Sequence, residues 1–143
     1  LEKSFQLAKH LSEKHKIYFF GGGKHEVETL DNWVSQIPNS ENVAGKLSLK
    51  EELLKIASLE IMISMDSANM HLASLVGTRC ISVWGATHPY AGFLGYGQHE
   101  DDVIQVKDLT CRPCSVFGDK KCYRGDWACL HEINIQQIMD KIQ

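Results

Sequence analysis

Two kinds of segment, which differ in the spacing of their hydrophobic residues, alternate along the chain. Apolar residues three and four positions apart predict amphipathic helices, and short β-branched or aromatic runs between them predict strands. We expect helices at residues 1–15, 24–37, 48–60, 67–77 and 133–142, and strands at residues 16–20, 61–65, 80–84 and 102–106.

The predicted helices carry start and stop signals. Ser48 begins the third helix with Glu51 three residues later, which is the pattern of a capping box. Pro38 follows the second helix, and Gly77 ends the fourth. The run at 61–65 is apolar on both faces, which predicts a strand in the middle of a parallel sheet.

The alternation of strands and helices predicts an α/β fold, a parallel sheet with helices on both faces. A chain of 143 residues is long enough for one domain with its own core. Ligands of such sheets bind at the carboxyl ends of the strands. The loops to consider there are therefore GGGKHE, MDSANMH and GATHP, which follow three of the predicted strands.

The composition narrows the classes of function. The chain is 43% hydrophobic and 23% charged, with a formal net charge of −3. That balance argues against a nucleic acid partner and against a polybasic membrane patch. No apolar run approaches the roughly 20 residues of a transmembrane helix, and no signal peptide is seen. Because the sequence does not begin with Met, we expect it to be part of a longer protein.

Small and polar residues precede the helix at 67–77. Asp66 or Ser67 can be its N-cap, and the free N–H groups of its first turn would then attract an anion. Alternatively, Asp66 only caps the helix, and His71 is a core histidine with no ligand. The glycine run at 21–23 lacks the GxGxxG spacing and is not a P-loop.

Four of the five cysteines gather in a loop at 107–131, whereas Cys80 stands alone in an apolar run. The cluster can bind zinc, with His131 as an alternative ligand, because it begins with a CxxC pair. Disulfides and free thiols are the other two alternatives, and each would leave the cluster a structural role. The four cysteines are Cys111, Cys114, Cys122 and Cys129.

The segment DSANMHLASLVGTRCISVWGATHP resembles the signature of the glycosyltransferase family 9 heptosyltransferases. The loop GGGKHE resembles an earlier loop of that family, and CRPC followed by CLHEI resembles its Cys-containing tail. The likeness runs from the first helix to the last. The residues that match the signature are Asp66, Ser67, His71, Leu72, Ala73, Gly85, Thr87 and Pro89.

The resemblance implies a GT-B fold, in which two Rossmann-like domains face a cleft. Residues 1–143 match only the C-terminal domain, which binds the nucleotide sugar, and the N-terminal acceptor domain is absent. Since the catalytic base belongs to that absent domain, no catalytic residue is named in this chain. The implied donor-binding residues are Glu26, Asp66, Ser67, Ala68, Asn69, His71, Gly85 and Thr87.

The resemblance also implies individual roles. Glu26 matches the acid that contacts the ribose of the nucleoside. Ser67 and the N–H groups after it would hold the diphosphate, with Thr87 near the phosphates and His71 facing the same site. We assign Asp66 to the sugar or to loop positioning, since a diphosphate would repel its carboxylate.

The sequence departs from the family pattern at several positions. Ala68 stands where the family has Gly, Asn69 where Pro is common, and Ala86 where Pro is frequent. The methyl group of Ala68 would crowd a phosphate or shift its approach. The family lysine that contacts the donor phosphate lies on a strand that this chain lacks.

The implied function is that of an inverting glycosyltransferase of lipopolysaccharide core or a similar glycan. It would take heptose, from ADP-heptose by family default, without a cofactor, and reach its glycolipid acceptor through the missing domain. The expected location is the cytoplasm or the inner face of the cytoplasmic membrane. The alternatives are a non-catalytic nucleotide-binding or Cys-stapled interaction module and a sugar-nucleotide epimerase, whose signature is not found.

Overall fold

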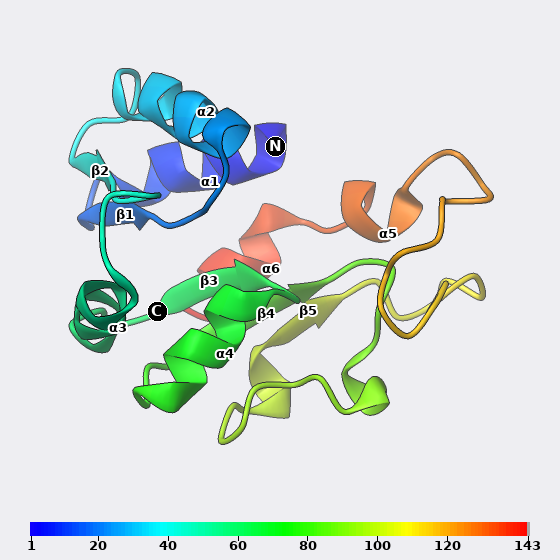
Figure 1. Cartoon of the computed structure of the whole chain (residues 1–143). Helices are drawn as coiled ribbons and strands as arrows, with labels where there is room; N and C mark the ends of the chain where they lie inside the picture. Colours follow the sequence, from blue (N-terminus) through cyan, green and yellow to red (C-terminus); the bar gives the residue numbers. More distant parts are fainter. Residues whose placement is uncertain (143) are drawn as a thin grey trace. The chain divides into compact units, whose positions relative to one another are not determined.

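A computed structural model of the chain describes residues 1–142. They form two compact units, Leu1–Glu52 and a second that begins at Leu53, each built from parallel strands and helices (Figure 1). The α/β class predicted from the sequence is confirmed in both units.

The first unit contains a two-stranded parallel sheet and two helices. The helices are α1 (Glu2–Leu11) and α2 (Lys24–Val34), and the strands are β1 (Ile17–Phe19) and β2 (Ser40–Asn42), with Phe19 opposite Asn42. Trp33 of α2 packs edge-on against the ring of Phe5 and against that of Phe19, with centroids 5.6 Å apart in each pair. The sequence did not predict β2, because Ser-Glu-Asn has no apolar residue.

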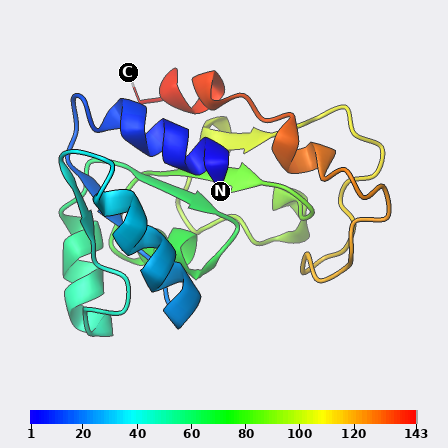
Figure 2. The ribbon, with the colours of Figure 1, turned by 90° about the horizontal axis from the view of Figure 1, so that it is seen from above.

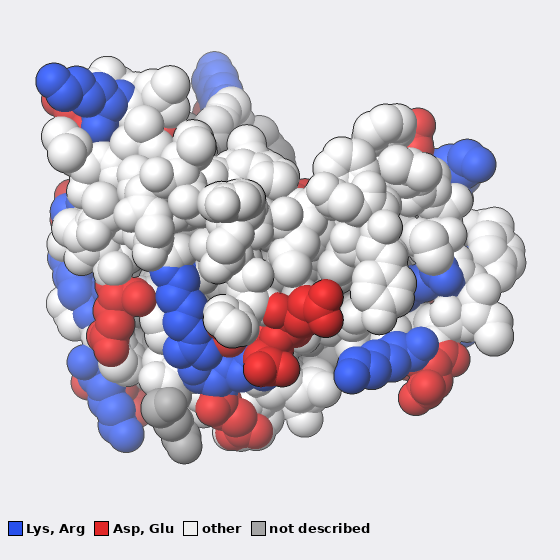
Figure 3. Space-filling view, turned by 90° about the horizontal axis from the view of Figure 1, so that it is seen from below, with Lys and Arg blue, Asp and Glu red and all other residues white. Residues whose placement is uncertain are grey.

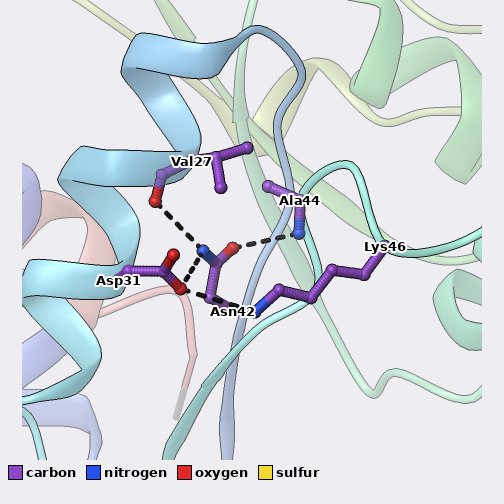
Figure 4. A network of polar contacts seen from close by, with 5 residues as sticks. All are labelled: Val27, Asp31, Asn42, Ala44 and Lys46. Atoms are coloured by element: carbon purple, nitrogen blue, oxygen red, sulfur yellow. Dashed lines mark hydrogen bonds and ion pairs between the residues drawn. The ribbon is translucent and has the colours of Figure 1, made fainter.

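A polar network ties β2 to α2 (Figure 4). Asn42, which is only 4% exposed, donates its side-chain amide to the Val27 carbonyl at 3.2 Å and to Asp31 Oδ1 at 2.8 Å. Its side-chain oxygen accepts the Ala44 N–H at 3.0 Å. Lys46 adds an ion pair to Asp31 at 3.4 Å. The buried amide is therefore fully paired, as a buried polar group must be.

The second unit contains a three-stranded parallel sheet in the order β3-β4-β5. Its strands are β3 (Met62–Met65), β4 (Cys80–Trp84) and β5 (Val103–Gln105). β4 pairs with both β3 and β5 and so forms the centre of the sheet, and every residue of β4 is buried. The prediction that 61–65 lies mid-sheet is wrong: β3 is an outer strand, and its burial alternates, with Met65 46% exposed.

Helices cover both faces of this sheet. α4 (Ala68–Leu75) connects β3 to β4, and α6 (Ile135–Met139) lies on the opposite face (Figures 1 and 2). α3 (Leu49–Ala57) precedes β3 and has the predicted capping box, in which Glu51 accepts the Ser48 N–H at 2.8 Å. The structure also contains three short elements that the sequence did not predict: a helix α5 (Ala128–His131) and the two 3-10 turns η1 (Pro89–Ala91) and η2 (Glu100–Asp102).

The surface charges and the lengths of the helices agree with what the composition predicted. Charged side chains of both signs are interspersed on the face drawn in Figure 3. This distribution fits the small net charge of −3 and gives no large basic field on that face. Across residues 1–142, none of the helices combines the length and the apolar character that crossing a membrane requires.

Candidate functional site

The two halves of the sequence motif meet at one edge of the sheet. β3 and β4 are parallel neighbours with Met65 opposite Val83, so the loops that follow them start side by side. The Asp66 N–H donates to the Val83 carbonyl at 3.3 Å and extends the pairing by one residue. Asp66 and Gly85 therefore leave the sheet at its carboxyl edge, where open α/β sheets bind ligands.

Ser67 takes the N-cap position of α4 with extended backbone, at φ −153° and ψ 172°. Its hydroxyl makes no capping bond and instead shares a hydrogen bond of 3.0 Å with the Ser64 hydroxyl. The interpretation of Asp66 as the N-cap is therefore wrong. Asp66 is half-buried, whereas Ser67 and Ala68 are exposed. The first turn of α4 therefore has backbone N–H groups that the Ser67 side chain does not cap, and they lie at the positive end of the helix dipole.

His71 is exposed on α4, whose buried residues are Met70 and Ala73. The alternative of a buried core histidine is therefore wrong. Asn69 is half-buried in the first turn. His71 lies one turn into the helix and is open to a ligand or to solvent.

The loop after β4 is covered rather than open. A Cβ atom on Gly85 would lie 2.7 Å from Leu130 Cδ2, so close packing of Leu130 accounts for this glycine. Thr87 is only 7% exposed, and its methyl group lies 3.1 Å from where a Cβ of Gly118 would be. Both contacting residues, Leu130 and Gly118, belong to the Cys-rich segment. The sequence had not predicted that this segment packs against the loop after β4.

Sequence reasoning missed Arg112. Its half-buried guanidinium donates to the carbonyls of Gly85, Thr87 and Val106, at 2.5, 2.9 and 2.7 Å. Burial lowers the pKa of this guanidinium, and the neighbouring cysteines, Cys129 foremost, act in the opposite direction. No local motif marks this arginine, because two of its three acceptors are backbone atoms 25 and 27 residues away in the sequence.

Glu26 occupies the first turn of α2 in the unit Leu1–Glu52. Its Oε2 accepts the Gly22 N–H at 2.8 Å, although the side chain is exposed. Gly23 is the N-cap at φ 58°, a backbone conformation that suits glycine. Glu26 therefore fixes the glycine loop before α2, in addition to any part it plays toward a ligand.

The five cysteines are free thiols. Within residues 1–142 no group of three His, Cys, Asp or Glu side chains is arranged to hold a metal ion. Burial raises the pKa of Cys80 to about 12. Hydrogen bonds from backbone N–H groups, that of Trp127 foremost, lower the pKa of Cys122.

The surface of the second unit also has two open depressions at the other end of the sheet. One of about 470 Å³ is lined by Thr78 and Arg79, which precede β4, and by Tyr96 to His99. The other is lined by residues 97–101. Neither contains a residue of the predicted donor site.

The chain is similar to proteins that transfer sugars. The family model "Glycosyltransferase family 9 (heptosyltransferase)" matches residues 2–131. Lipooligosaccharide heptosyltransferase 2 of Campylobacter jejuni is 26% identical over 95% of this chain. Lipopolysaccharide heptosyltransferase 2 of Salmonella typhimurium is 26% identical over 96% of it. The chain spans only 42% and 39% of the lengths of these two relatives.

Two solved structures share the fold. The family 9 glycosyl transferase from Veillonella parvula superposes with a TM-score of 0.70, over 97% of this chain and 39% of its own. The E. coli ADP-heptose lps heptosyltransferase II gives 0.71, over 98% and 39%. Because both are only 19% identical to this chain, the likeness establishes its fold alone.

Proposed function

The chain belongs to glycosyltransferase family 9, and on that premise we propose that it is the donor-binding domain of an inverting glycosyltransferase. The observation that carries the proposal is the shared start of the two motif loops, where Asp66 and Gly85 leave neighbouring strands. A nucleoside diphosphate sugar would bind across this edge. The whole of residues 1–143 would serve as that domain.

The first turn of α4 would hold the diphosphate. Its free backbone N–H groups are donors at a positive helix end. The Ser67 hydroxyl, which is hydrogen-bonded to Ser64 in this structure, would turn toward the diphosphate to join them. Such donors stabilise the negative charge that develops on the leaving nucleoside diphosphate as the glycosidic bond breaks, and they need no metal. Asp66 would accept a hydroxyl of the donor sugar, and His71 would face the same ligand from one turn further along.

The nucleoside end would be held by Glu26, whose exposed carboxylate can accept ribose hydroxyls. The loop with Gly85 and Thr87 would lie beside the phosphates. Because Thr87 is nearly buried, it would act mainly through the shape and backbone of the loop.

The names of the relatives support the substrate class. The similar proteins are heptosyltransferases, and one of the solved structures is of an ADP-heptose enzyme. We therefore propose heptose as the sugar, ADP as the carrier and the lipopolysaccharide or lipooligosaccharide core as the acceptor. The acceptor site and the catalytic base would lie in a further domain of the whole enzyme, acting at the inner face of the cytoplasmic membrane without a cofactor.

The test is the binding of ADP to the 143-residue chain by calorimetry, before and after Ala68→Glu. Position 68 is exposed in the first turn of α4, where an acidic side chain stabilises a helix. The variant should keep the melting temperature and bind ADP at least about tenfold more weakly, because a carboxylate there repels the diphosphate. Ala57→Glu, the same change at an exposed position of α3, is the control. Failure of the unmodified chain to bind ADP, or equal binding by the Ala68 variant, would overturn the proposal.

A further inference from the structure

We propose that Arg112 is a positioning residue for the donor, because its guanidinium holds the loop at 85–87 in place at the carboxyl edge of the sheet. This inference rests on the proposed function of that edge. It assigns a role to the Cys-rich segment, for which the sequence offered only metal, disulfide or free thiols.

The guanidinium joins two separate parts of the chain. Two of its bonds go to the carbonyls of Gly85 and Thr87 after β4, and the third goes to Val106 after β5. All three are charge-assisted bonds to backbone oxygens. Planar Arg presents several donors in a rigid fork, so one side chain can fix three carbonyls that no single Lys ammonium would span.

Other residues of the Cys-rich segment close around the same loop. The Cys114 N–H donates to the Ala86 carbonyl at 2.8 Å, between the two carbonyls that Arg112 binds. Leu130 covers Gly85, and Gly118 lies against Thr87. Three successive carbonyls of the loop, 85 to 87, are therefore bonded to Arg112 or Cys114. These bonds restrict the backbone conformation of the loop.

Loss of Arg112 would be felt at the loop and not in the sheet. β4 is paired along its length with β3 and β5, and it is buried throughout. Without the guanidinium, buried carbonyls at 85 and 87 would lose their donor, and the loop would shift to reach water. Such a shift would change the surface next to Asp66, where the diphosphate is proposed to lie.

The acceptors of Arg112 are neutral, so its full positive charge remains on this side of the sheet. That charge would add to the attraction of the edge for an anion. Arg124, in the same segment, differs on this point. It is paired with Asp126, at 2.7 Å, and neither residue bonds the loop. Arg124 therefore provides a control of the same residue type.

The experiment compares Arg112→Gln, Arg112→Lys and the control Arg124→Gln in the 143-residue chain. Hydrogen exchange of the Cys114 amide reports the hold on the loop, and the Met62 amide, bonded to Arg79 O at 2.9 Å, reports the sheet. Calorimetry with ADP and with adenosine reports the site.

For Arg112→Gln we expect the Cys114 amide to exchange at least about tenfold faster and ADP to bind roughly tenfold more weakly. Exchange at Met62 and the affinity for adenosine should not change, because adenosine has no phosphate to meet the loop. Arg112→Lys should lie between, and Arg124→Gln should match the unmodified chain. If Arg112→Gln also exposes Met62, the comparison is made with Arg112→Lys.

Two results for ADP binding and loop exchange would each overturn the positioning role, and a third result, with adenosine, would do so as well. One is unchanged exchange at Cys114, and the other is faster exchange with unchanged ADP affinity, which would make Arg112 purely structural. Equal losses for ADP and adenosine would also contradict it. If the unmodified chain binds no ADP, the proposed function itself fails, and that result is separate because it appears before any variant is made.

Discussion

Arg79 and Asp102 form a two-point ion pair, with Arg79 Nε 2.8 Å from Oδ2 and Nη2 2.6 Å from Oδ1 of Asp102. Arg79 immediately precedes β4 and Asp102 immediately precedes β5, so the pair links the starts of two neighbouring strands. Asp102 is only 6% exposed. The hydrogen bonds from Arg79 lower the pKa of its carboxyl below the usual 3.8.

Asp102→Asn should lower the free energy of unfolding by about 1–3 kcal/mol at neutral pH, because the buried charge-assisted bonds are lost. A depressed carboxyl pKa stabilises the fold above the usual pKa of 3.8, and this contribution disappears as the pH falls through the folded value. The difference between the two proteins should therefore shrink below that pH. Urea unfolding at a series of pH values from neutral to below 3.8 measures this difference in unfolding free energy, and Asp101→Asn, at an exposed position, is the control. Equal stability of Asp102→Asn and the unmodified chain at neutral pH would refute the prediction.

Asn42→Asp should destabilise the first unit more than Asn42→Ala at neutral pH. The new carboxylate would face Asp31 Oδ1, which now accepts the Asn42 amide at 2.8 Å (Figure 4). The pKa of Asp31 is held low chiefly by that same bond, so Asp31 is charged at neutral pH. We expect Asn42→Ala to lower the free energy of unfolding by about 2–4 kcal/mol, because the paired amide is lost.

Acid should partly relieve Asn42→Asp, because protonation of either carboxyl removes the repulsion. Thermal unfolding at neutral and at mildly acidic pH distinguishes this from simple loss of packing. A deficit of Asn42→Asp that does not change with pH would contradict the prediction.

The sequence predicted elements whose signals are local. The capping box of Ser48 and Glu51 and the buried strand 80–84 depend on neighbouring residues, and both are present. The order of strands and helices also predicted that Asp66 and Gly85 would share a sheet edge, since parallel neighbours end together. That juxtaposition needed only topology and no side-chain detail.

Features that depend on distant contacts could not be predicted. β2 is a polar tripeptide, paired with β1 and held by the side chain of Asn42. Arg112 acts on carbonyls 25 and 27 residues away, Thr87 and Gly85, and no spacing in the sequence connects them. The strand 61–65 was placed mid-sheet because its composition is apolar, although Met65 is 46% exposed. Composition reports burial only on average.

The cysteines should differ in their rate of alkylation. Cys122 should react first with iodoacetamide, because backbone N–H groups stabilise its thiolate and lower its pKa. Cys80 should react last, since burial raises its pKa to about 12. Peptide mapping after short exposure at mildly alkaline pH gives the order. Cys122→Ser should remove the fastest phase and leave the others; a fastest phase that survives this substitution would disprove the assignment.

The last prediction concerns Glu26, for which two roles compete. Its Oε2 accepts the Gly22 N–H at 2.8 Å, so it stabilises the start of α2 whether or not a ligand binds. Under the proposed function, the same carboxylate also accepts ribose hydroxyls.

Glu26→Gln separates the two roles, because the amide oxygen of Gln can still accept the Gly22 N–H while the negative charge is gone. The fold should be kept. If Glu26 holds the ribose, loss of a charge-assisted pair of hydrogen bonds should weaken adenosine and ADP alike, by roughly tenfold to a hundredfold in Kd. The affinity loss for adenosine distinguishes this variant from Arg112→Gln, which should affect ADP alone. Calorimetry with both ligands and a melting curve measure the outcome. A lower melting temperature with unchanged adenosine affinity would leave Glu26 as a helix-start residue and remove it from the donor site.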